Sequence, residues 1–112
     1  MIIGFHTKKL AKAFNSFNNL QKHFGDLAPR ISARMTVLKG APALAAVPID
    51  PPPRRHLLKG KYVGCYAVDL NGNWRLVFKP AHDPLPLLPD GGHDLAAITQ
   101  IEIIAVTDYH DT

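Results

Sequence analysis

The sequence has a single cysteine, Cys65, and no long run of apolar residues. One cysteine cannot form an intramolecular disulfide, which indicates a reducing compartment. The apolar run at residues 1 to 5 is far shorter than the core of a signal peptide or a membrane span. No segment repeats, and this excludes solenoid architectures. We therefore expect a cytoplasmic protein that has no association with a membrane.

Residue groupings typical of metal or phosphate-loop sites are also missing. The sequence contains no Cys/His cluster and no His-x-x-x-His pair, so we expect neither a metal nor another cofactor. Gly91-Gly92 forms a flexible turn without the lysine that follows a phosphate-binding loop. Any catalysis must then come from ordinary side chains.

The chain has enough apolar residues to fold without disulfide or metal support. Apolar residues make up 46% of the 112 positions and charged residues 20%, which favours a folded globular protein over a disordered one. We expect one domain spanning residues 1 to 112, because this length suits a single core.

Acidic residues are scarce in the first half of the chain. Residues 1 to 62 carry eleven Lys and Arg against Asp26 and Asp50, a net charge of +9, whereas the last fifty residues carry two bases and seven acids, a net charge of −5. A basic half suits a polyanion such as RNA, whose phosphates attract Lys and Arg. A solvated basic surface explains the same charges equally well.

The first elements are predicted from capping residues and apolar spacing. Residues 2 to 6 read as a short strand, and Thr7 is placed to cap a helix over 8 to 24 that ends at Gly25. The apolar positions of this helix recur at three- and four-residue spacing and predict one buried stripe: Leu10, Phe14, Phe17, Leu20 and Phe24.

A second helix is predicted to begin near Pro29 and to end at Gly40, because proline is tolerated in the first turn of a helix. Residues 41 to 55 then contain several prolines and predict a surface connection that is partly extended. The apolar stripe of the second helix consists of Ile31, Met35 and Leu38.

A β-hairpin is the strongest local prediction. Two β-rich runs, 62 to 70 and 73 to 79, are joined across Asn71-Gly72. A three-residue loop, Leu70-Asn71-Gly72 with Gly72 left-handed, unites the apolar residues of both strands on one face. Asn73 and Arg75 then share the other face. The predicted pairs are Val68 with Trp74 and Tyr66 with Leu76, and the predicted core residues are Tyr66, Trp74, Leu76 and Phe78.

The last third of the chain is predicted to hold an irregular insertion and a final strand. Residues 80 to 97 are rich in Pro and Gly, which argues against regular structure. Residues 99 to 107 are apolar enough for a largely buried strand.

Three short motifs resemble the signatures of HigB-type killer proteins, which belong to the RelE/ParE toxin superfamily. They are His56-Leu57-Leu58-Lys59-Gly60, Asn73-Trp74-Arg75 and Asp108-Tyr109-His110. Each motif is weak alone, but their order and spacing make the combination specific. The resemblance covers nearly the whole chain. It implies an α+β fold of the RelE type, with two helices packed on one face of a small, mainly antiparallel sheet.

The resemblance implies the toxin of a toxin–antitoxin module, which cleaves messenger RNA on the ribosome without a metal. In such a reaction the ribose 2′-OH attacks the adjacent phosphate, so the enzyme supplies a base, an acid and cations. By this match Arg75 is the main electrostatic stabiliser and Lys59 its partner. His56 and His110 form the acid–base pair, and which of them is the base stays open.

The remaining expected roles concern the binding of RNA. Tyr109 is expected among the catalytic residues and would stack on a base, and Asn73 and Asp108 would orient neighbouring groups. The basic residues expected to bind RNA are Lys8, Lys9, Lys12, Arg54, Arg55 and Lys61. We expect the catalytic groups to converge around one phosphate-sized hollow on the side of the sheet away from the helices.

The resemblance also implies the partners: a cognate helix-turn-helix antitoxin of the HigA type, the ribosome and messenger RNA. Two other functions stay open at this point. A ParE-type inhibitor of DNA gyrase shares this general fold, and function depends on the site rather than on the fold. A protein-interaction module without activity is the third alternative.

Overall fold

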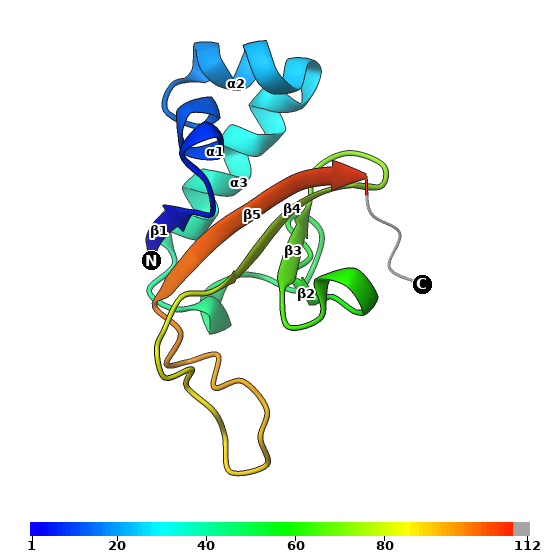
Figure 1. Cartoon of the computed structure of the whole chain (residues 1–112). Coiled ribbons are helices and arrows are strands. Elements are labelled where there is room, and N and C mark those ends of the chain that lie inside the picture. The colour runs from blue at the N-terminus through cyan, green and yellow to red at the C-terminus, as the bar shows by residue number, and fades with distance from the viewer. Residues whose placement is uncertain (109–112) are drawn as a thin grey trace.

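The core of the molecule is a five-stranded mixed sheet built from strands that are far apart in the sequence (Figure 1). The computed structural model describes residues 1–108. Only β1 and β5 are parallel; the other neighbouring strands are antiparallel. In spatial order the strands are β1 (Ile2–Phe5), β5 (Gln100–Asp108), β4 (Trp74–Pro80), β3 (Tyr66–Asp69) and β2 (His56–Leu57).

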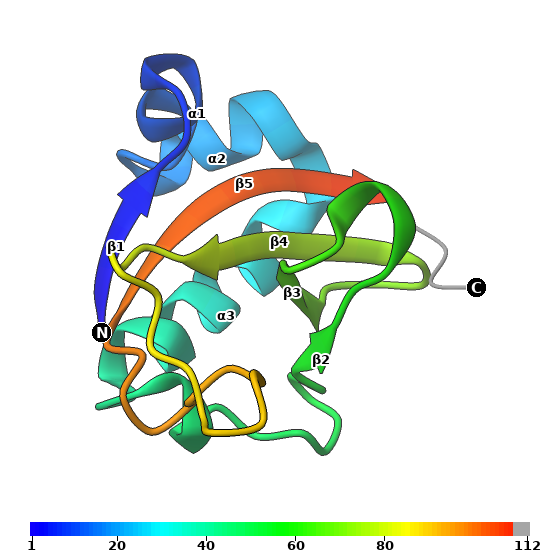
Figure 2. The same ribbon diagram turned by 60° about the horizontal axis from the view of Figure 1, so that its bottom comes forward.

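The α-helices cover one face of this sheet (Figures 1 and 2). They are α1 (Lys8–Ala13), α2 (Phe17–Phe24) and α3 (Ala28–Gly40), and short 3-10 turns follow at η1 (Gly25–Leu27), η2 (Leu44–Ala46) and η3 (Gly60–Tyr62). The apolar stripe predicted for the second helix is buried against the sheet in α3. The main core joins α3 to the hairpin and to β5 through Ile31, Leu38, Val68, Leu76, Phe78, Ile101 and Ile103.

The single helix predicted over residues 8 to 24 is wrong, because the chain forms two helices there. Ser16 interrupts the helix by capping a new one: its Oγ accepts a hydrogen bond from the Asn19 N–H at 3.1 Å. The Asn19 side chain donates to the Lys12 carbonyl at 3.1 Å and so satisfies the end of α1. Thr7 caps α1 as predicted, by accepting from the Leu10 N–H. The break leaves Phe17 45% exposed instead of buried.

The cap at Ser16 gives a stability prediction. Ser16→Ala should lower the free energy of unfolding by about 1 kcal/mol, because the Asn19 N–H loses its acceptor. Urea denaturation at equilibrium measures the change. Thr36→Ala is the control, because Thr36 is an exposed residue inside α3, and its effect should stay within about 0.5 kcal/mol. Equal effects of the two substitutions would contradict the capping role.

The hairpin forms as predicted, but its register is shifted and the predicted pairs are wrong. Tyr66 lies opposite Phe78, Val68 opposite Leu76, and Asp69 opposite Arg75. The loop is Asn71-Gly72-Asn73, one residue later than predicted, and Gly72 is left-handed with φ 57°. The partner of each residue moves by two positions, which keeps the same residues on each face. The observed register stacks the rings of Tyr66 and Phe78, with centroids 6.2 Å apart.

The face of the sheet away from the helices carries a second, smaller core, which was not predicted. Leu58, Ala67 and Val77 are buried there beneath the segment that leads through η3, with Tyr62, Cys65 and Ile104 packed around them. Trp74 was predicted in the core and is instead 39% exposed, because it closes the hairpin at its tip.

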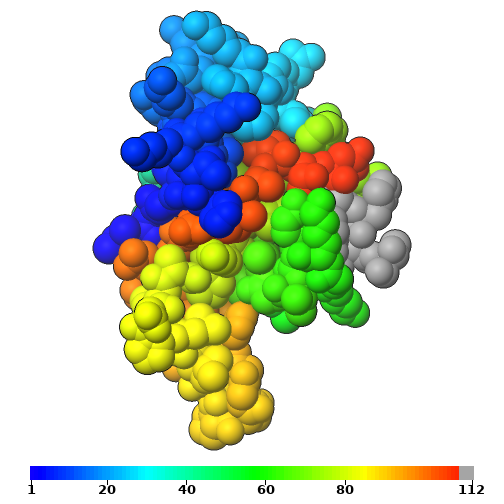
Figure 3. All heavy atoms as spheres, in the orientation of Figure 1, coloured from blue at the N-terminus to red at the C-terminus, as the bar shows by residue number. Residues whose placement is uncertain are grey.

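The connection between α3 and β2 packs differently from the connection between β4 and β5. The segment from 41 to 55 was predicted as a surface connection, but it contributes Leu44 and Val47 to the main core. Residues 80 to 97 form the predicted irregular insertion, which projects from the sheet (Figure 3). Its ends are tied down by side chains: His82 Nε2 accepts from the Thr99 N–H at 3.0 Å, and His93 hydrogen-bonds the Tyr66 hydroxyl at 2.7 Å.

Candidate functional site

The strand register places His56 and Arg75 on the same face of the sheet. His56 lies opposite Ala67 on β3, and Arg75 lies opposite Asp69, two residues further along the same strand. Directly opposed residues share a face, and so do residues two apart on one strand. Ala67 is buried in the small core on the side away from the helices. His56 and Arg75 therefore flank β3 on that side, as the sequence predicted.

Arg75 is buried, with only 7% of its surface exposed. Its Nε lies 3.0 Å from Asp69 Oδ1, and its Nη1 donates to the carbonyls of Gly72 at 2.9 Å and Trp74 at 3.2 Å. The left-handed Gly72 aims its carbonyl at the guanidinium. Arg75 Nε is buried, and its contact with Asp69 is an ion pair without hydrogen-bond geometry. Among residues 1–108 no acceptor contacts Nη2, and this nitrogen is not among the buried atoms. Nη2 is therefore the nitrogen left for an external anion.

Asp69 is the residue of this site that sequence reasoning missed. Its carboxylate binds Arg54 through both oxygens, with Oδ2 2.5 Å from Nε and Oδ1 3.0 Å from Nη2, and it also pairs with Arg75. Arg34 reaches it from the helical layer, donating from Nε to the Asp69 carbonyl at 2.7 Å. Two guanidinium groups thus pair with the Asp69 carboxylate and a third binds its main-chain carbonyl, so the positive charges at Asp69 outnumber the negative one. The correct hairpin register would have revealed the Asp69–Arg75 pair.

His56 is half-buried at the start of β2, and its orientation is set by the backbone. Its Nδ1 lies 2.8 Å from the Arg54 carbonyl. A carbonyl only accepts hydrogen bonds, so Nδ1 carries the proton and Nε2 carries the lone pair of the neutral ring. In this tautomer Nε2 carries the lone pair that a base needs, and the nitrogen itself is buried.

The two lysines after β2 are exposed. Lys59 follows Leu58, whose buried side chain fixes this segment to the small core. Lys61 lies in η3 with its Nζ 5.3 Å from the centre of the Tyr62 ring, within range of a cation–π contact. The segment that contains Lys59 therefore rests on the same face as His56 and Arg75.

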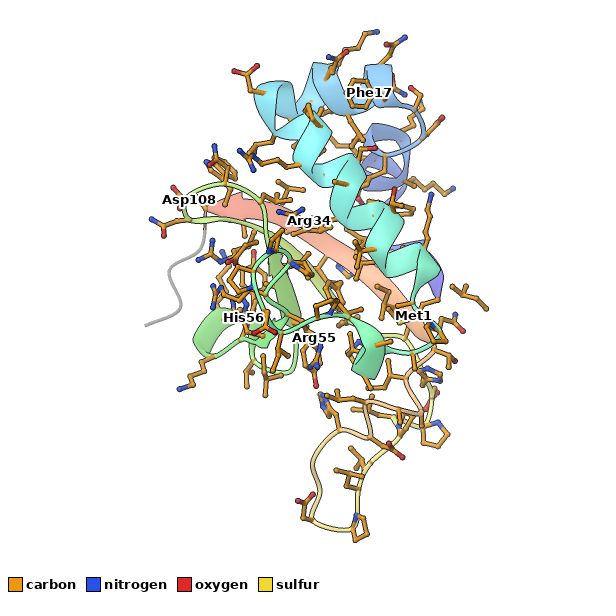
Figure 4. All side chains as sticks on the ribbon, turned by 180° about the vertical axis from the view of Figure 1, so that it is seen from behind. Met1, Phe17, Arg34, Arg55, His56 and Asp108 are labelled. Atoms are coloured by element: carbon orange, nitrogen blue, oxygen red, sulfur yellow. The ribbon has the colours of Figure 1, made fainter. Side chains whose placement is uncertain are left out.

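The end of β5 places Asp108, the first residue of the C-terminal motif, beside the hairpin. Thr107 lies opposite Arg75 and Asp108 opposite Trp74, beside the hairpin tip that carries Asn73. Figure 4 shows Asp108 at the end of β5, beside the hairpin. Tyr109 and His110 lie outside the described residues, so their roles stay predictions.

The basic residues expected to bind RNA fall into two groups. Lys8, Lys9 and Lys12 are exposed on α1, which follows β1 at the edge of the sheet opposite β2. Arg54 and Arg55 lie before β2 and have contacts within the protein, Arg54 with Asp69 and Arg55 Nε with the Val47 carbonyl at 3.0 Å. The lysines of α1 are thus not brought to His56 and Arg75 by the fold.

Cys65 gives a prediction about reactivity. Burial raises the pKa of the Cys65 thiol, and the positive charge of Lys79 lowers it by less. The thiolate is the reactive form, so Cys65 should react with a disulfide reagent at pH 8 more slowly than glutathione does. Lys79→Ala should slow the reaction further, because it removes the charge that favours the thiolate. A rate in the folded protein that equals the rate in urea would contradict this.

Residues 1–108 contain neither a membrane-spanning helix nor a grouped set of metal ligands. In that part of the chain no helix combines the length and the apolar character that a membrane span requires. Within the same residues, no three or more His, Cys, Asp or Glu side chains are grouped as a metal site requires.

The fold is that of known bacterial toxins. Comparison of the sequence with protein-family models and with curated proteins found no match. Among solved structures, the chain is similar to the YoeB/ParE toxin from Agrobacterium tumefaciens, with a TM-score of 0.56, 13% identity, and 98% of this chain and 100% of that chain covered. It is also similar to a chain of the YoeB-YefM complex from Staphylococcus aureus, with a TM-score of 0.50, 16% identity, and 98% and 97% covered.

These likenesses confirm the predicted α+β fold of the RelE type. At 13% and 16% identity they establish the fold alone. The finer resemblance to HigB and the roles of the individual residues stay predictions.

Proposed function

We propose that this protein is the toxin of a type II toxin–antitoxin pair and that it cleaves messenger RNA on the ribosome. The observation that carries the proposal is the placement of His56 and Arg75 on one face, on either side of β3. Two guanidinium groups on the Asp69 carboxylate and a third on its main-chain carbonyl make this region positive, which favours a phosphate. The similarity in fold to known toxins agrees with it.

The proposed reaction needs only side chains of these types. His56 removes the proton of the ribose 2′-OH at its Nε2, and the 2′-oxygen forms a bond to the adjacent phosphorus. The bond from phosphorus to the 5′-oxygen breaks, and His110 supplies the proton to that leaving oxygen. The products are a 2′,3′-cyclic phosphate and a 5′-hydroxyl. Arg75 Nη2 and Lys59 stabilise the charge that gathers on the phosphate oxygens.

The other side chains are proposed to hold the RNA. Tyr109 stacks on a base, Asn73 and Asp108 orient their neighbours, and Lys61, Arg54 and Arg55 add positive charge beside the site. The lysines of α1, at the opposite edge of the sheet, contact RNA remote from the cleaved phosphate.

The partner is proposed to be a cognate antitoxin of the helix-turn-helix, HigA type. One similar structure is a chain of the YoeB-YefM complex. This supports a protein partner for the toxin, but it does not indicate a partner of the helix-turn-helix type. Ribosomes and the antitoxin would both be met in the cytoplasm. Growth arrest on induction that is relieved by expressing the neighbouring gene would support the pairing.

Translating ribosomes, a defined messenger and the purified protein test the proposal. We expect cuts within the translated codons, mapped by primer extension, that are absent without ribosomes. The new ends should be a 2′,3′-cyclic phosphate and a 5′-hydroxyl. Intact messenger alongside a folded protein would reject the proposal.

A second candidate function is suggested by the similar Agrobacterium structure, which is a YoeB/ParE toxin. ParE-type inhibition of DNA gyrase is therefore the alternative to RNA cleavage. Gyrase-dependent DNA breaks with intact messenger would favour it, and cut messenger with normal supercoiling would exclude it.

A further inference from the structure

Asp69 is held by two separate parts of the chain, the segment at Pro53 and Arg54 and the helix α3. Its N–H donates to the Pro53 carbonyl at 2.8 Å, and its carbonyl accepts from Arg34 on α3 at 2.7 Å. Its carboxylate binds Arg54, which precedes β2, through both oxygens. These contacts fix the backbone and the side chain together, so the carboxylate is a preorganised partner for Arg75.

The carboxylate determines which part of Arg75 remains available. Asp69 Oδ1 lies 3.0 Å from Arg75 Nε, and the hairpin carbonyls of Gly72 and Trp74 hold Nη1. A guanidinium is planar, so fixing two of its nitrogens fixes the direction of the third, Nη2. The side chain of Arg75 is only 9% exposed. Without the Asp69 carboxylate, its buried positive charge would have only neutral carbonyl partners, which favours movement of the guanidinium toward solvent.

We propose that Asp69 is a positioning residue that aims Arg75 Nη2 at the phosphate to be cleaved. This inference rests on the proposed function. Asp69 does not touch the RNA itself: its oxygens are engaged by Arg54 and Arg75. It acts through the geometry of Arg75, so its removal should slow the chemical step and leave the binding of ribosomes almost unchanged.

Asp69→Asn is the direct test, because it keeps the shape and removes the charge. The rate constant of cleavage at saturating ribosomes should fall about 10- to 100-fold, the scale expected for a displaced catalytic group. The ribosome concentration that gives half the maximal rate should change less than about twofold, because the exposed cations remain. Asp69→Glu, which restores a carboxylate, should recover most of the lost rate.

Glu102→Gln is the matched control. Glu102 is also a strand carboxylate in ion pairs, with His6 at 3.0 Å and Lys79 at 3.7 Å, and its side chain is 28% exposed against 27% for Asp69. Within residues 1–108, Glu102 forms ion pairs with His6 and Lys79 and with no arginine of the site. Its substitution should leave both cleavage constants unchanged.

A second measurement follows Arg75 without relying on activity. In protein labelled with ¹⁵N-arginine, the Nε–H signals of Arg54 and Arg75 should be protected from solvent exchange in the wild type and in Glu102→Gln. Asp69→Asn should lose this protection at Arg75. Retained protection would overturn the positioning role, since Arg75 would then be held by other groups.

The outcomes separate this inference from the proposed function. If the wild type cleaves messenger and Asp69→Asn cleaves it at the same rate, the positioning role is wrong and the nuclease stands. If Asp69→Asn loses only stability, with an unchanged rate per folded molecule, the role is also overturned. If the wild type does not cleave at all, the proposed function fails, and loss of arginine protection in Asp69→Asn identifies a purely structural ion pair.

Discussion

Arg75→Lys is expected to slow messenger cleavage by about 100- to 1000-fold, the effect of losing one anion-stabilising donor. The guanidinium contacts Asp69 and the hairpin carbonyls, and in the proposed reaction its Nη2 would also bind the phosphate. An ammonium is a single point of charge and cannot bridge these directions together. The loss should therefore occur although the positive charge is kept. Single-turnover cleavage on translating ribosomes measures it.

The choice of lysine rather than alanine keeps a cation beside Asp69, so the fold should be retained. Urea denaturation of the variant confirms this before its rate is read. Arg30→Lys, an exposed arginine on α3, is the control and should cleave at the wild-type rate. Wild-type cleavage by a folded Arg75→Lys would reject Arg75 as the electrostatic stabiliser.

His56→Gln should reduce the cleavage rate by about 100- to 10,000-fold, the range expected when a general base is lost. Glutamine can still donate to the Arg54 carbonyl, so the local structure should survive. It has no basic nitrogen in place of Nε2, so the 2′-OH keeps its proton. The same single-turnover assay measures the loss.

His23→Gln is the matched control for this histidine. His23 Nδ1 also lies 2.9 Å from a backbone carbonyl, that of Asn19 on α2, but His23 is exposed on the helical layer. Its substitution should leave cleavage unchanged. Equal activity of His56→Gln and His23→Gln would exclude His56 as the base and leave His110 as the candidate.

The sequence predicts the fold well where local rules decide the structure. Thr7, Gly25 and Gly72 each adopt the predicted capping or turn conformation. The helix over 8 to 24 is wrong because apolar spacing continues through Ser16, whereas the hydroxyl of Ser16 and the amide of Asn19 favour a new start. Periodicity cannot detect a competing cap inside an apolar stripe.

The site is predicted in part, because it depends on pairing between distant segments. The alternation of side chains between the two faces of a strand was enough to place Arg75 on the face away from the main core. The hairpin register decides its partner, and a shift of the loop by one residue replaces Asn73 with Arg75 opposite Asp69. The small core that covers this face comes from the segment around Leu58, whose packing no local pattern indicates.

The exposure of Trp74 has the same origin. The alternation of side chains along β4 assigns Trp74 to the core face. Trp74 nevertheless closes the hairpin at a point that the helices do not cover, and it stays 39% exposed. Burial at a hairpin end depends on how far the covering layer extends. How far the helices extend over the hairpin depends on the tertiary structure, and the alternation of side chains along a strand does not predict it.

The central claim is that His56 and Arg75 act on one RNA phosphate, and mapping RNA ends in cells after brief induction tests it most directly. We expect new 5′-hydroxyl ends inside translated regions with the wild type, and their loss with both His56→Gln and Arg75→Lys. The same ends at the same abundance in all three strains would contradict it.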